Sequence, residues 1–290
     1  MLILKKKNVI GIIKANDILF CWRLTMKIGI DAGGTLLKIV YIEDRERRFE
    51  KRPSSEIDSL IGELNRDHTE DEIFLTGGKA EYMDEKLEPP TRLSIEFDAT
   101  YRGLSRLMEE QGVSLGRFVY LNVGTGTSFH QADGSGQKRV GGSGVGGGTL
   151  IGLSSLLTGV DSYEDIVRLA AQGNRDKIDL QVHHIYAGRP TPIPGDITAS
   201  NFGRILMDDL PNLSDADKLQ AVIGLIAETV TVVGISLAEG FDTKDIVFIG
   251  STLLNNGVMT EIIGRYAGLK GVNPHIIENG EYSGALGAVL

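Results

Sequence analysis

An aspartate, two glycines and a threonine stand together in the segment KIGIDAGGTLLKIV, from Lys27 to Val40. Apolar residues lead up to Asp31, and Gly33, Gly34 and Thr35 follow it. Glycine lets a backbone approach a ligand closely, and the amide groups of such a turn can form a concave anion site. One carboxylate beside phosphates suits Mg²⁺, which keeps several waters. The segment therefore predicts either a phosphate site with Mg²⁺ at Asp31 or an ordinary tight hairpin with glycine at its turn.

The same pattern returns about 90 residues further along the chain, which indicates a duplicated, two-lobed architecture. An apolar strand, Phe118 to Val123, precedes a GTGT turn, Gly124 to Thr127, and a second strand runs from Ser128 to Gln131. Such a turn also occurs without a ligand. Because two of them stand at matching places, we interpret both as nucleotide-binding turns.

A third glycine-rich stretch, Gly141 to Gly148, precedes an apolar helix that we expect to begin near Thr149. A helix that opens from a glycine loop directs free N–H groups and the positive end of its dipole toward an anion. The alternative is a hinge or a close contact between the helix and a strand. Arg139 stands just before this loop, and its planar guanidinium can pair with two oxygens of a carboxylate or phosphate.

Two carboxylates, Glu96 and Asp98, precede an amphipathic helix with Leu104, Leu107 and Met108 on one face. Glu96 stands between two apolar residues, and an apolar setting makes a carboxylate a better base. The residues alone leave Glu96 open between a general base and a surface residue on a strand. For Asp98 we favour the role of helix N-cap.

Two adjacent histidines, His183 and His184, fall in the segment Asp179 to Tyr186. Neighbouring side chains point to different faces of a helix or strand, so we expect structural or surface residues here and no shared metal site. Ser251 follows the buried strand DIVFIG at its carboxyl end, where open α/β sheets bind ligands. It is either a nucleotide contact or a simple turn residue.

The segment from Leu213 to Gly240, with Ser214 as its N-cap, predicts one long helix that is apolar nearly all round. We expect a buried central helix that also serves a subunit interface. It is not predicted to span a membrane, because Glu228 and several polar residues interrupt it. Thr198 or Ser200 is expected to cap a further helix after a proline-rich loop.

Composition limits the possible functions. The chain has 290 residues, enough for one large or two medium domains, and a net charge of −9, which argues against nucleic-acid and membrane partners that require a basic face. The single cysteine, Cys21, excludes an intramolecular disulfide framework and cysteine-cluster metal sites, and fits a reducing compartment. Residues 1–25 form neither a secretory signal nor a membrane span, and we expect Met26 to be the native start.

The motifs DAGGTLLK, LTGG, EFDA, NVGTGTS, RVGGSGVGGGT, PGDITASNFG, FIGS and ENGEYSGALGA occur in this order. Together they closely resemble the type II pantothenate kinases of staphylococci and bacilli, from Met26 to the last residue. The resemblance implies a two-lobed α/β fold of the actin-like and sugar-kinase superfamily, duplicated and ribonuclease H-like, with ATP in the interlobe cleft. We expect an N-terminal lobe at 26–115, a C-terminal lobe at 116–290 and a non-native extension at 1–25.

The resemblance also implies the reaction: a cytoplasmic homodimer uses ATP and Mg²⁺ to phosphorylate pantothenate to 4′-phosphopantothenate, the first step of coenzyme A biosynthesis. Glu96 would be the general base on the pantothenate hydroxyl, and Arg139 would hold the pantothenate carboxylate or the transferring phosphate. Asp31 would lie beside Mg²⁺. The other implied nucleotide contacts are Gly33, Gly34, Thr35, Leu36, Leu37, Lys38, Thr125, Gly147, Gly148, Thr149, Leu150, Ile151, Tyr163 and Ser251, with backbone contacts expected at 149–151.

Three other functions remain to be weighed. One is a kinase of the same superfamily that acts on an amino sugar; its zinc-dependent members carry a cysteine cluster, which this chain lacks. Another is an ATPase that activates a second enzyme through an iron–sulfur cluster, which a chain with a single cysteine cannot hold in the usual way. The last is a non-catalytic sensor of coenzyme A or nucleotide, which the set of Asp31, Glu96 and Arg139 argues against. The sequence leaves open both feedback by coenzyme A and acceptance of pantetheine.

Overall fold

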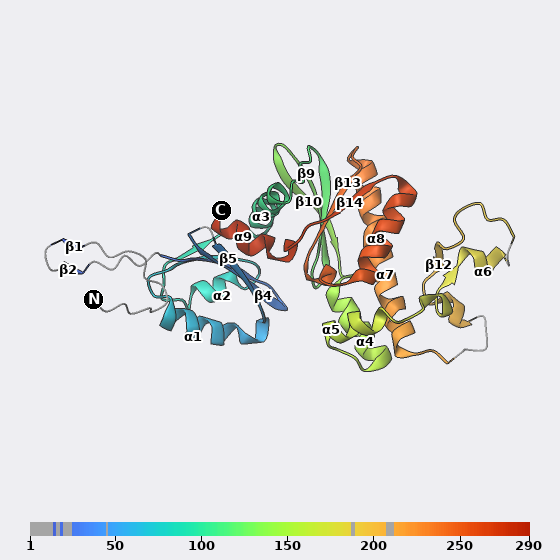
Figure 1. Cartoon of the computed structure of the whole chain (residues 1–290), viewed down its shortest axis with the longest axis horizontal. Coiled ribbons are helices and arrows are strands. Elements are labelled where there is room, and N and C mark those ends of the chain that lie inside the picture. Colours follow the sequence, from blue (N-terminus) through green and yellow to red (C-terminus); the bar gives the residue numbers. More distant parts are fainter. Residues whose placement is uncertain (1–13, 16–17, 20–24, 45, 187–188, 207–211) are drawn as a thin grey trace. The chain divides into compact units, whose positions relative to one another are not determined.

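The computed structural model describes residues 14–15, 18–19, 25–44, 46–186, 189–206 and 212–290 (Figure 1). The expected non-native extension lies mostly outside these residues; the described part contains Thr25 and two short paired strands, β1 (Lys14–Ala15) and β2 (Ile18–Leu19). The chain forms two compact units. Unit 1 runs to Arg106 and includes Tyr282–Leu290, and unit 2 is Leu107–Glu281, so the division differs from the expected one at 115/116.

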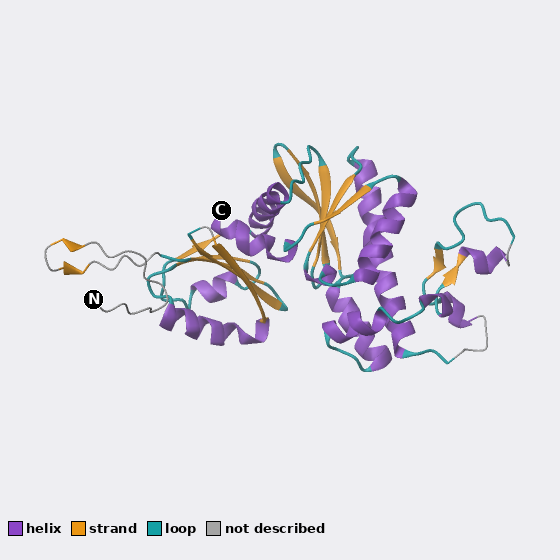
Figure 2. Ribbon diagram, viewed as in Figure 1, coloured by secondary structure: helices purple, strands orange, loops and turns teal. Residues whose placement is uncertain are grey.

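Unit 1 contains a five-stranded sheet in the order β5-β4-β3-β6-β7. Strands are drawn in orange and helices in purple in Figure 2. Strands β3, β4 and β5 form an antiparallel meander, β6 pairs parallel with β3, and β7 pairs parallel with β6. The strands are β3 (Lys27–Ala32), β4 (Leu36–Glu43), β5 (Glu46–Pro53), β6 (Glu72–Thr76) and β7 (Thr91–Leu93). The helices are η1 (Ser54–Glu56), α1 (Ile57–Asp67), α2 (Ala80–Asp84), α3 (Glu96–Glu110, in unit 2 from Leu107), η5 (Gly280–Tyr282, in unit 1 from Tyr282) and α9 (Ser283–Val289).

Three glycines let α9 pack closely in unit 1. A Cβ on Gly29 of β3 would lie 2.0 Å from the carbonyl oxygen of Ala285, and a Cβ on Gly103 of α3 would lie 1.9 Å from that of Ser283. A Cβ on Gly287 would lie 1.8 Å from the carbonyl oxygen of Ala99. No side chain fits at these distances, so the small-residue composition of the C-terminal helix is a packing requirement. The other core of the unit joins α1 to the alternating apolar residues of β3 and β4, such as Ile28, Ile30, Leu37 and Ile39.

Unit 2 repeats the same sheet pattern, in the order β10-β9-β8-β13-β14. Again three antiparallel strands precede two parallel ones, which confirms the duplication predicted from the two glycine turns. The strands are β8 (Phe118–Val123), β9 (Thr127–Asp133), β10 (Gly136–Ser143), β13 (Asp245–Ile249) and β14 (Asn273–Ile276). The main helices are α4 (Gly147–Thr158), α5 (Tyr163–Ala170), α7 (Asp215–Gly240) and α8 (Gly257–Lys270), and the shorter elements are η2 (Arg175–Lys177), β11 (Leu180–Gln181), α6 (Val182–Tyr186), β12 (Thr198–Ser200), η3 (Gly203–Leu206) and η4 (Ser251–Leu253).

The long helix α7 is the central helix of unit 2, as predicted. Ser214 caps it, and its Oγ accepts from the N–H of Asp217 at 3.2 Å. By length and composition alone α7 would suit a membrane, but 67% of its most apolar window is buried inside the protein. Inside the unit, Glu228 pairs with the guanidinium of Arg175 at 2.7 Å. These contacts favour a core helix.

Several local predictions need correction. Glu96 begins α3, so Asp98 lies in the first turn of the helix and is not its N-cap. Thr198 and Ser200 lie in β12 and cap no helix, because this segment pairs with β11. Helix α4 begins at Gly147 rather than near Thr149, and Gly141 is already part of β10.

The side chains of the two adjacent histidines do not diverge as the prediction assumed, whereas the expectation that they bind no shared metal stays untested. Nε2 of His183 lies 3.9 Å and Nε2 of His184 lies 3.4 Å from the same oxygen, Oδ1 of Asp176. Because α6 is a single short turn and imidazoles are long, two rings that leave the backbone in different directions still reach one neighbour.

Candidate active site

The hairpin of β3 and β4 forms a tight tip in unit 1. The amide of Gly33 lies 3.1 Å from the carbonyl oxygens of both Asp31 and Leu36, so this N–H serves the turn. Gly34 is exposed, and a Cβ there would meet nothing within 4 Å. Thr35 is exposed as well. The tip therefore exposes Gly34 and Thr35 to solvent, while Gly33 holds the turn closed.

Neighbouring elements brace the hairpin tip. Ser54 is buried; its N–H donates to the carbonyl of Thr35 at 2.8 Å and its Oγ donates to the carbonyl of Gly33 at 2.9 Å. The ammonium of Lys79 donates to the same Oγ at 2.8 Å. Sequence reasoning missed both residues, because neither stands within the glycine motif. Their effect is to fix the tip and to place a cation beneath it.

Asp31 is held in one orientation at the end of β3. It faces Lys38 across the hairpin, and Nζ of Lys38 donates to its Oδ2 at 2.9 Å. The two side chains are only 14% and 16% exposed. Space around the carboxylate depends on two glycines: a Cβ on Gly77 would lie 2.6 Å from Oδ1, and one on Gly284 would lie 3.1 Å from Oδ2. The absence of a side chain at Gly77, the third position of the motif LTGG, therefore has a structural reason.

The residues around Asp31 fit a hydrated Mg²⁺. Mg²⁺ binds through one or two carboxylates and retains most of its waters. Asp31 supplies a rigid carboxylate, and the glycines beside it leave no side chain to displace water. Lys38 pairs with one oxygen of this carboxylate, Oδ2. The other oxygen, Oδ1, is the one that a second cation could bind.

Glu96 begins α3 on the surface of the chain. Glu96 and Ile95 are both exposed, Ile95 to 71%, so the apolar setting expected from the neighbouring residues is not found. The positive end of the helix dipole favours a carboxylate in this first turn. A carboxylate in this position can accept a proton, as a general base must.

In unit 2 the glycine loop and the GTGT turn are tied together through their backbones. The N–H of Gly147 donates to the carbonyl of Gly124 at 2.7 Å, and the N–H of Gly148 donates to that of Thr125 at 2.8 Å. These two amides of the first turn of α4 are therefore committed to the protein, contrary to the free N–H groups expected from a glycine loop. Thr125 is exposed and Thr149 is partly buried, and Oγ1 of Thr149 donates to the carbonyl of Gly144 at 2.8 Å.

The turn after β13 joins the same cluster. Gly250 has φ of +114° and its Cβ would lie 2.4 Å from the carbonyl oxygen of Val123, so only glycine fits before Ser251. Thr252 is buried, and its Oγ1 donates to the carbonyl of Gly124 at 3.0 Å. The hydroxyl of Tyr163 lies 2.8 Å from the carbonyl oxygen of Thr252 and 2.9 Å from that of Leu254. Burial raises the pKa of Tyr163, which keeps this hydroxyl a donor.

The structure thus brings five predicted residues of unit 2 together: Thr125, Gly147 and Gly148 by direct contact, and Tyr163 and Ser251 through the turn at Thr252. Two other predicted residues are not available as side chains. Leu150 is 1% exposed and Leu37 of the unit 1 hairpin is 0% exposed, so only their backbones could meet a ligand. Leu36 and Ile151 are partly buried.

Arg139 lies in β10, opposite His130 of β9, with an irregularity in the pairing before Gly141. Its guanidinium runs along the strand to Gly142, where a Cβ would lie 2.6 Å from Nη2. Burial lowers the pKa of His130, so its ring is neutral beside this cation. No local pattern in the sequence indicates that Gly142 makes room for the arginine.

Comparison with known proteins identifies relatives along almost the whole chain. The family model described as Fumble matches residues 48–290. A type II pantothenate kinase of Staphylococcus saprophyticus is 46% identical over 264 residues, which cover 91% of this chain and 99% of the relative. A type II pantothenate kinase of Staphylococcus aureus strain USA300 is 44% identical over 264 residues, with 91% and 98% covered.

Solved structures of much lower identity share the fold. Component A of (R)-2-hydroxyglutaryl-CoA dehydratase from Acidaminococcus fermentans matches with a TM-score of 0.59 at 16% identity, covering 91% of this chain and 96% of that one. A ROK family glucokinase from Streptomyces griseus, in complex with glucose and AMPPNP, matches with a TM-score of 0.51 at 14% identity, covering 91% and 98%. Both support the two-lobed sugar-kinase-like architecture, and neither carries information on the substrate.

Proposed function

The chain belongs to the Fumble family of type II pantothenate kinases, and we propose that it transfers the γ-phosphate of ATP to the primary hydroxyl of pantothenate. The product is 4′-phosphopantothenate, the first intermediate of coenzyme A biosynthesis. The observation that carries the proposal is the similarity to curated pantothenate kinases along nearly their entire length. The structure adds a rigid acidic residue beside a glycine hairpin in unit 1 and a linked set of glycine turns in unit 2.

In unit 1 we assign the phosphate groups to the hairpin tip. Gly34 and Thr35 supply exposed backbone and a hydroxyl, and Lys38 and Lys79 supply positive charge near the tip. Asp31 would hold Mg²⁺, which neutralises phosphate charge when it is bound. Because Ser54 and Gly33 fix the tip, little reorganisation is needed when phosphate binds.

Glu96 and Arg139 are the proposed catalytic residues. Glu96 accepts the proton of the pantothenate hydroxyl as that oxygen attacks phosphorus and the bond to ADP breaks. Arg139 pairs with the pantothenate carboxylate or with the transferring phosphate, for which its two-pronged guanidinium is suited. Gly142 keeps space for the guanidinium along β10, so it is proposed as a positioning residue.

In unit 2 we assign the nucleotide to the exposed edge of the linked turns. Thr125, Thr149 and Ser251 supply polar groups there, and the amides of Gly147 and Gly148 serve to lock the two turns together. Tyr163 has the same locking role for the turn after Ser251. The nucleotide contacts of this unit thus depend on a preformed backbone arrangement.

We further propose a cytoplasmic homodimer. Apolar side chains remain exposed on unit 2, with Leu156 of α4 at 83% and Val232 of α7 at 49%, and a second copy of the chain would cover them. Light scattering after gel filtration tests this proposal. A dimer gives about 63 kDa, twice the 31.4 kDa of one chain, and a mass near that of one chain at micromolar concentration would contradict it.

The experiment for the reaction is ADP release by the purified chain with ATP, Mg²⁺ and a panel of acceptors: pantothenate, N-acetylglucosamine, glucose and none. The proposal predicts ADP release that depends on pantothenate, with the sugars at the level of no acceptor. Turnover with an amino sugar would favour the sugar-kinase alternative. Nucleotide binding without turnover on any acceptor would favour the sensor alternative.

A further inference from the structure

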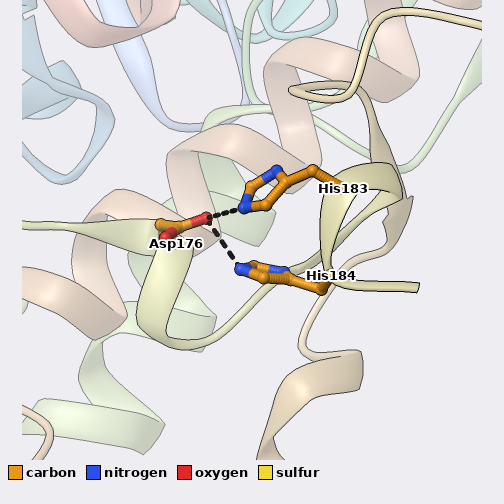
Figure 3. A group of neighbouring side chains, drawn as sticks. All are labelled: Asp176, His183 and His184. Atoms are coloured by element: carbon orange, nitrogen blue, oxygen red, sulfur yellow. Dashed lines mark ion pairs between the residues drawn. The ribbon is translucent and has the colours of Figure 1, made fainter. Parts of the chain in front are cut away.

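One carboxylate and two imidazoles converge in unit 2 (Figure 3), and none of the three residues has a proposed role in the reaction. Asp176 lies in η2, and His183 and His184 lie next to each other in α6. Both rings turn toward Oδ1 of Asp176. We propose that these three side chains bind a divalent transition-metal ion, with Zn²⁺ as the ion they suit best.

The central oxygen of the cluster accepts no hydrogen bond within the described part of the chain; Nε2 of His184 lies 3.4 Å away but does not form one. Oδ1 of Asp176 is buried and has no hydrogen-bond partner within the described part of the chain. The other oxygen, Oδ2, lies 3.7 Å from Nη1 of Arg204. A buried carboxylate oxygen without a donor is unfavourable, and a bound cation would compensate it.

His183 is oriented as a metal ligand. Its Nδ1 lies 2.9 Å from the carbonyl oxygen of Gly195, which can only accept, so Nδ1 carries the proton. In the neutral ring Nε2 then has a free electron pair, and that pair faces Oδ1 of Asp176 at 3.9 Å. Metal-bound histidines characteristically donate their other N–H to a carbonyl or carboxylate, which is the arrangement here.

His184 must change its tautomer to join the site. Its Nδ1 accepts from the N–H of Gln181 at 3.0 Å, so without metal the neutral ring keeps its proton on Nε2. Metal binding at Nε2 moves this proton to Nδ1 and gives up that bond. Arg204 also lies close, with Nη1 3.2 Å from Nε2. Both features weaken the site, and the tautomer change provides a distinctive signal of binding.

The distances suit tetrahedral coordination after a small closure. Zn²⁺ bonds of about 2.0–2.1 Å place tetrahedral ligand atoms about 3.4 Å apart. Oδ1 of Asp176 and Nε2 of His184 already lie 3.4 Å apart, and all three ligand atoms lie within 4.8 Å of one another. The side chain of His183 is 47% exposed, so it can rotate inward. Two nitrogens and one oxygen favour Zn²⁺ over Mg²⁺ or Ca²⁺, which prefer oxygen ligands, and water fills the fourth position.

A bound ion would act on stability rather than on the reaction. It would join η2 to α6, and η2 is already linked to the core helix, because Arg175 pairs with Glu228 of α7. The segment between α5 and α7 would thereby be fixed to the body of unit 2. An ion that binds only the folded chain raises its stability by mass action.

The test uses the full chain without a histidine tag, stripped with chelator and kept in excess Mg²⁺ so that hard-cation sites are filled. ZnCl₂ is added while the ring nitrogens are followed by ¹H–¹⁵N NMR, which is practical because the chain has five histidines. We expect one equivalent of zinc to shift the ring signals of His183 and His184, and the proton of His184 to move from Nε2 to Nδ1. The rings of His68, His130 and His275 should not change.

Variants then assign the ligands by competition with a chromophoric chelator. His183→Gln and Asp176→Asn should each weaken zinc binding at least about 10-fold. Loss of a residue that only hydrogen-bonds to a metal ligand already costs that much, and these two residues are proposed as ligands themselves. The matched control is His275→Gln, which removes a histidine that lies 2.8 Å from Asp245 as a single pair; it should bind zinc as the unaltered chain does. The proposal is overturned if zinc in molar excess leaves both rings unshifted, or if His184 keeps its proton on Nε2 when zinc is bound. The NMR titration decides even if a variant fails to fold.

Discussion

Replacement of Gly77 by alanine tests the geometry around Asp31. Gly77 has φ of +93°, and a Cβ there would lie 2.6 Å from Oδ1 of Asp31 and 2.8 Å from the carbonyl oxygen of Ala32. The positive φ costs an alanine about 1 kcal/mol or more, and overpacking costs about 1–3 kcal/mol. Gly77→Ala should therefore lower the free energy of unfolding by about 2–4 kcal/mol, as measured by urea denaturation.

The same substitution should reduce catalysis. The carbonyl of Ala32 belongs to β3 and cannot rotate away, so the carboxylate of Asp31 must move to relieve its share of the clash. A misplacement of about 1 Å at a reacting group costs up to about 10²-fold in rate. We expect kcat for ADP release with saturating ATP and pantothenate to fall at least about 10-fold.

Gly78→Ala is the matched control. Gly78 is the next residue in the chain, but it has no positive φ of the kind that excludes alanine, and its Cβ would meet nothing within 4 Å. Its stability should stay within about 0.5 kcal/mol of the unaltered chain, with normal kcat. If the two variants behave alike in both assays, the crowding around Asp31 has no functional meaning.

Three further substitutions test other parts of the site. Glu96→Gln should lower kcat at least about 10²-fold with ATP affinity nearly kept, because it removes the proposed base; near-normal kcat would remove Glu96 from that role. Tyr163→Phe takes a donor from the carbonyls of Thr252 and Leu254, so KM for ATP should rise about 3- to 10-fold while KM for pantothenate stays the same, and unchanged KM for ATP would refute the locking role. Asp217 is buried, which opposes ionisation, but hydrogen bonds from Lys177, Asn174 and Ser214 hold its pKa at about 2, below the usual 3.8. The ionised carboxylate therefore contributes to the free energy of unfolding. This contribution is complete above the unfolded-state pKa and is lost as pH falls through the folded-state value. Asp217→Asn should accordingly destabilise the chain at pH 7 and flatten the dependence of unfolding free energy on pH between about 4 and 2, and an unchanged slope there would contradict the assignment.

The strands and the duplication were predictable because apolar runs that end on glycine turns carry a strong local signal. Strand β10 was not predicted, since GQKRVGGS has no apolar alternation and is recruited by pairing with β9. The long helix α7 and its Ser214 cap could be predicted, unlike β10, because the apolar residues and the capping hydroxyl are local features of the sequence.

The chemistry of the site was predictable only as residue types. The sequence pointed to Asp31 but not to Gly77 and Gly284, whose contacts with it are made through the tertiary fold. It predicted a glycine loop at Gly147 but not that the amides of this loop donate to the carbonyls of Gly124 and Thr125. Those acceptors belong to a different turn, which only the tertiary fold brings close. The rule that adjacent side chains diverge failed at His183 because it describes the direction of Cβ and not the reach of a ring.

The most direct test of the proposed reaction is ³¹P NMR of a mixture of the chain, ATP, Mg²⁺ and pantothenate. The account predicts that a phosphomonoester signal grows in step with ADP, only when pantothenate is present, and that mass spectrometry identifies 4′-phosphopantothenate. The signal should be lost with Asp31→Asn. Formation of ADP with inorganic phosphate as the only other product, or a phosphomonoester that forms with N-acetylglucosamine and not with pantothenate, would contradict it.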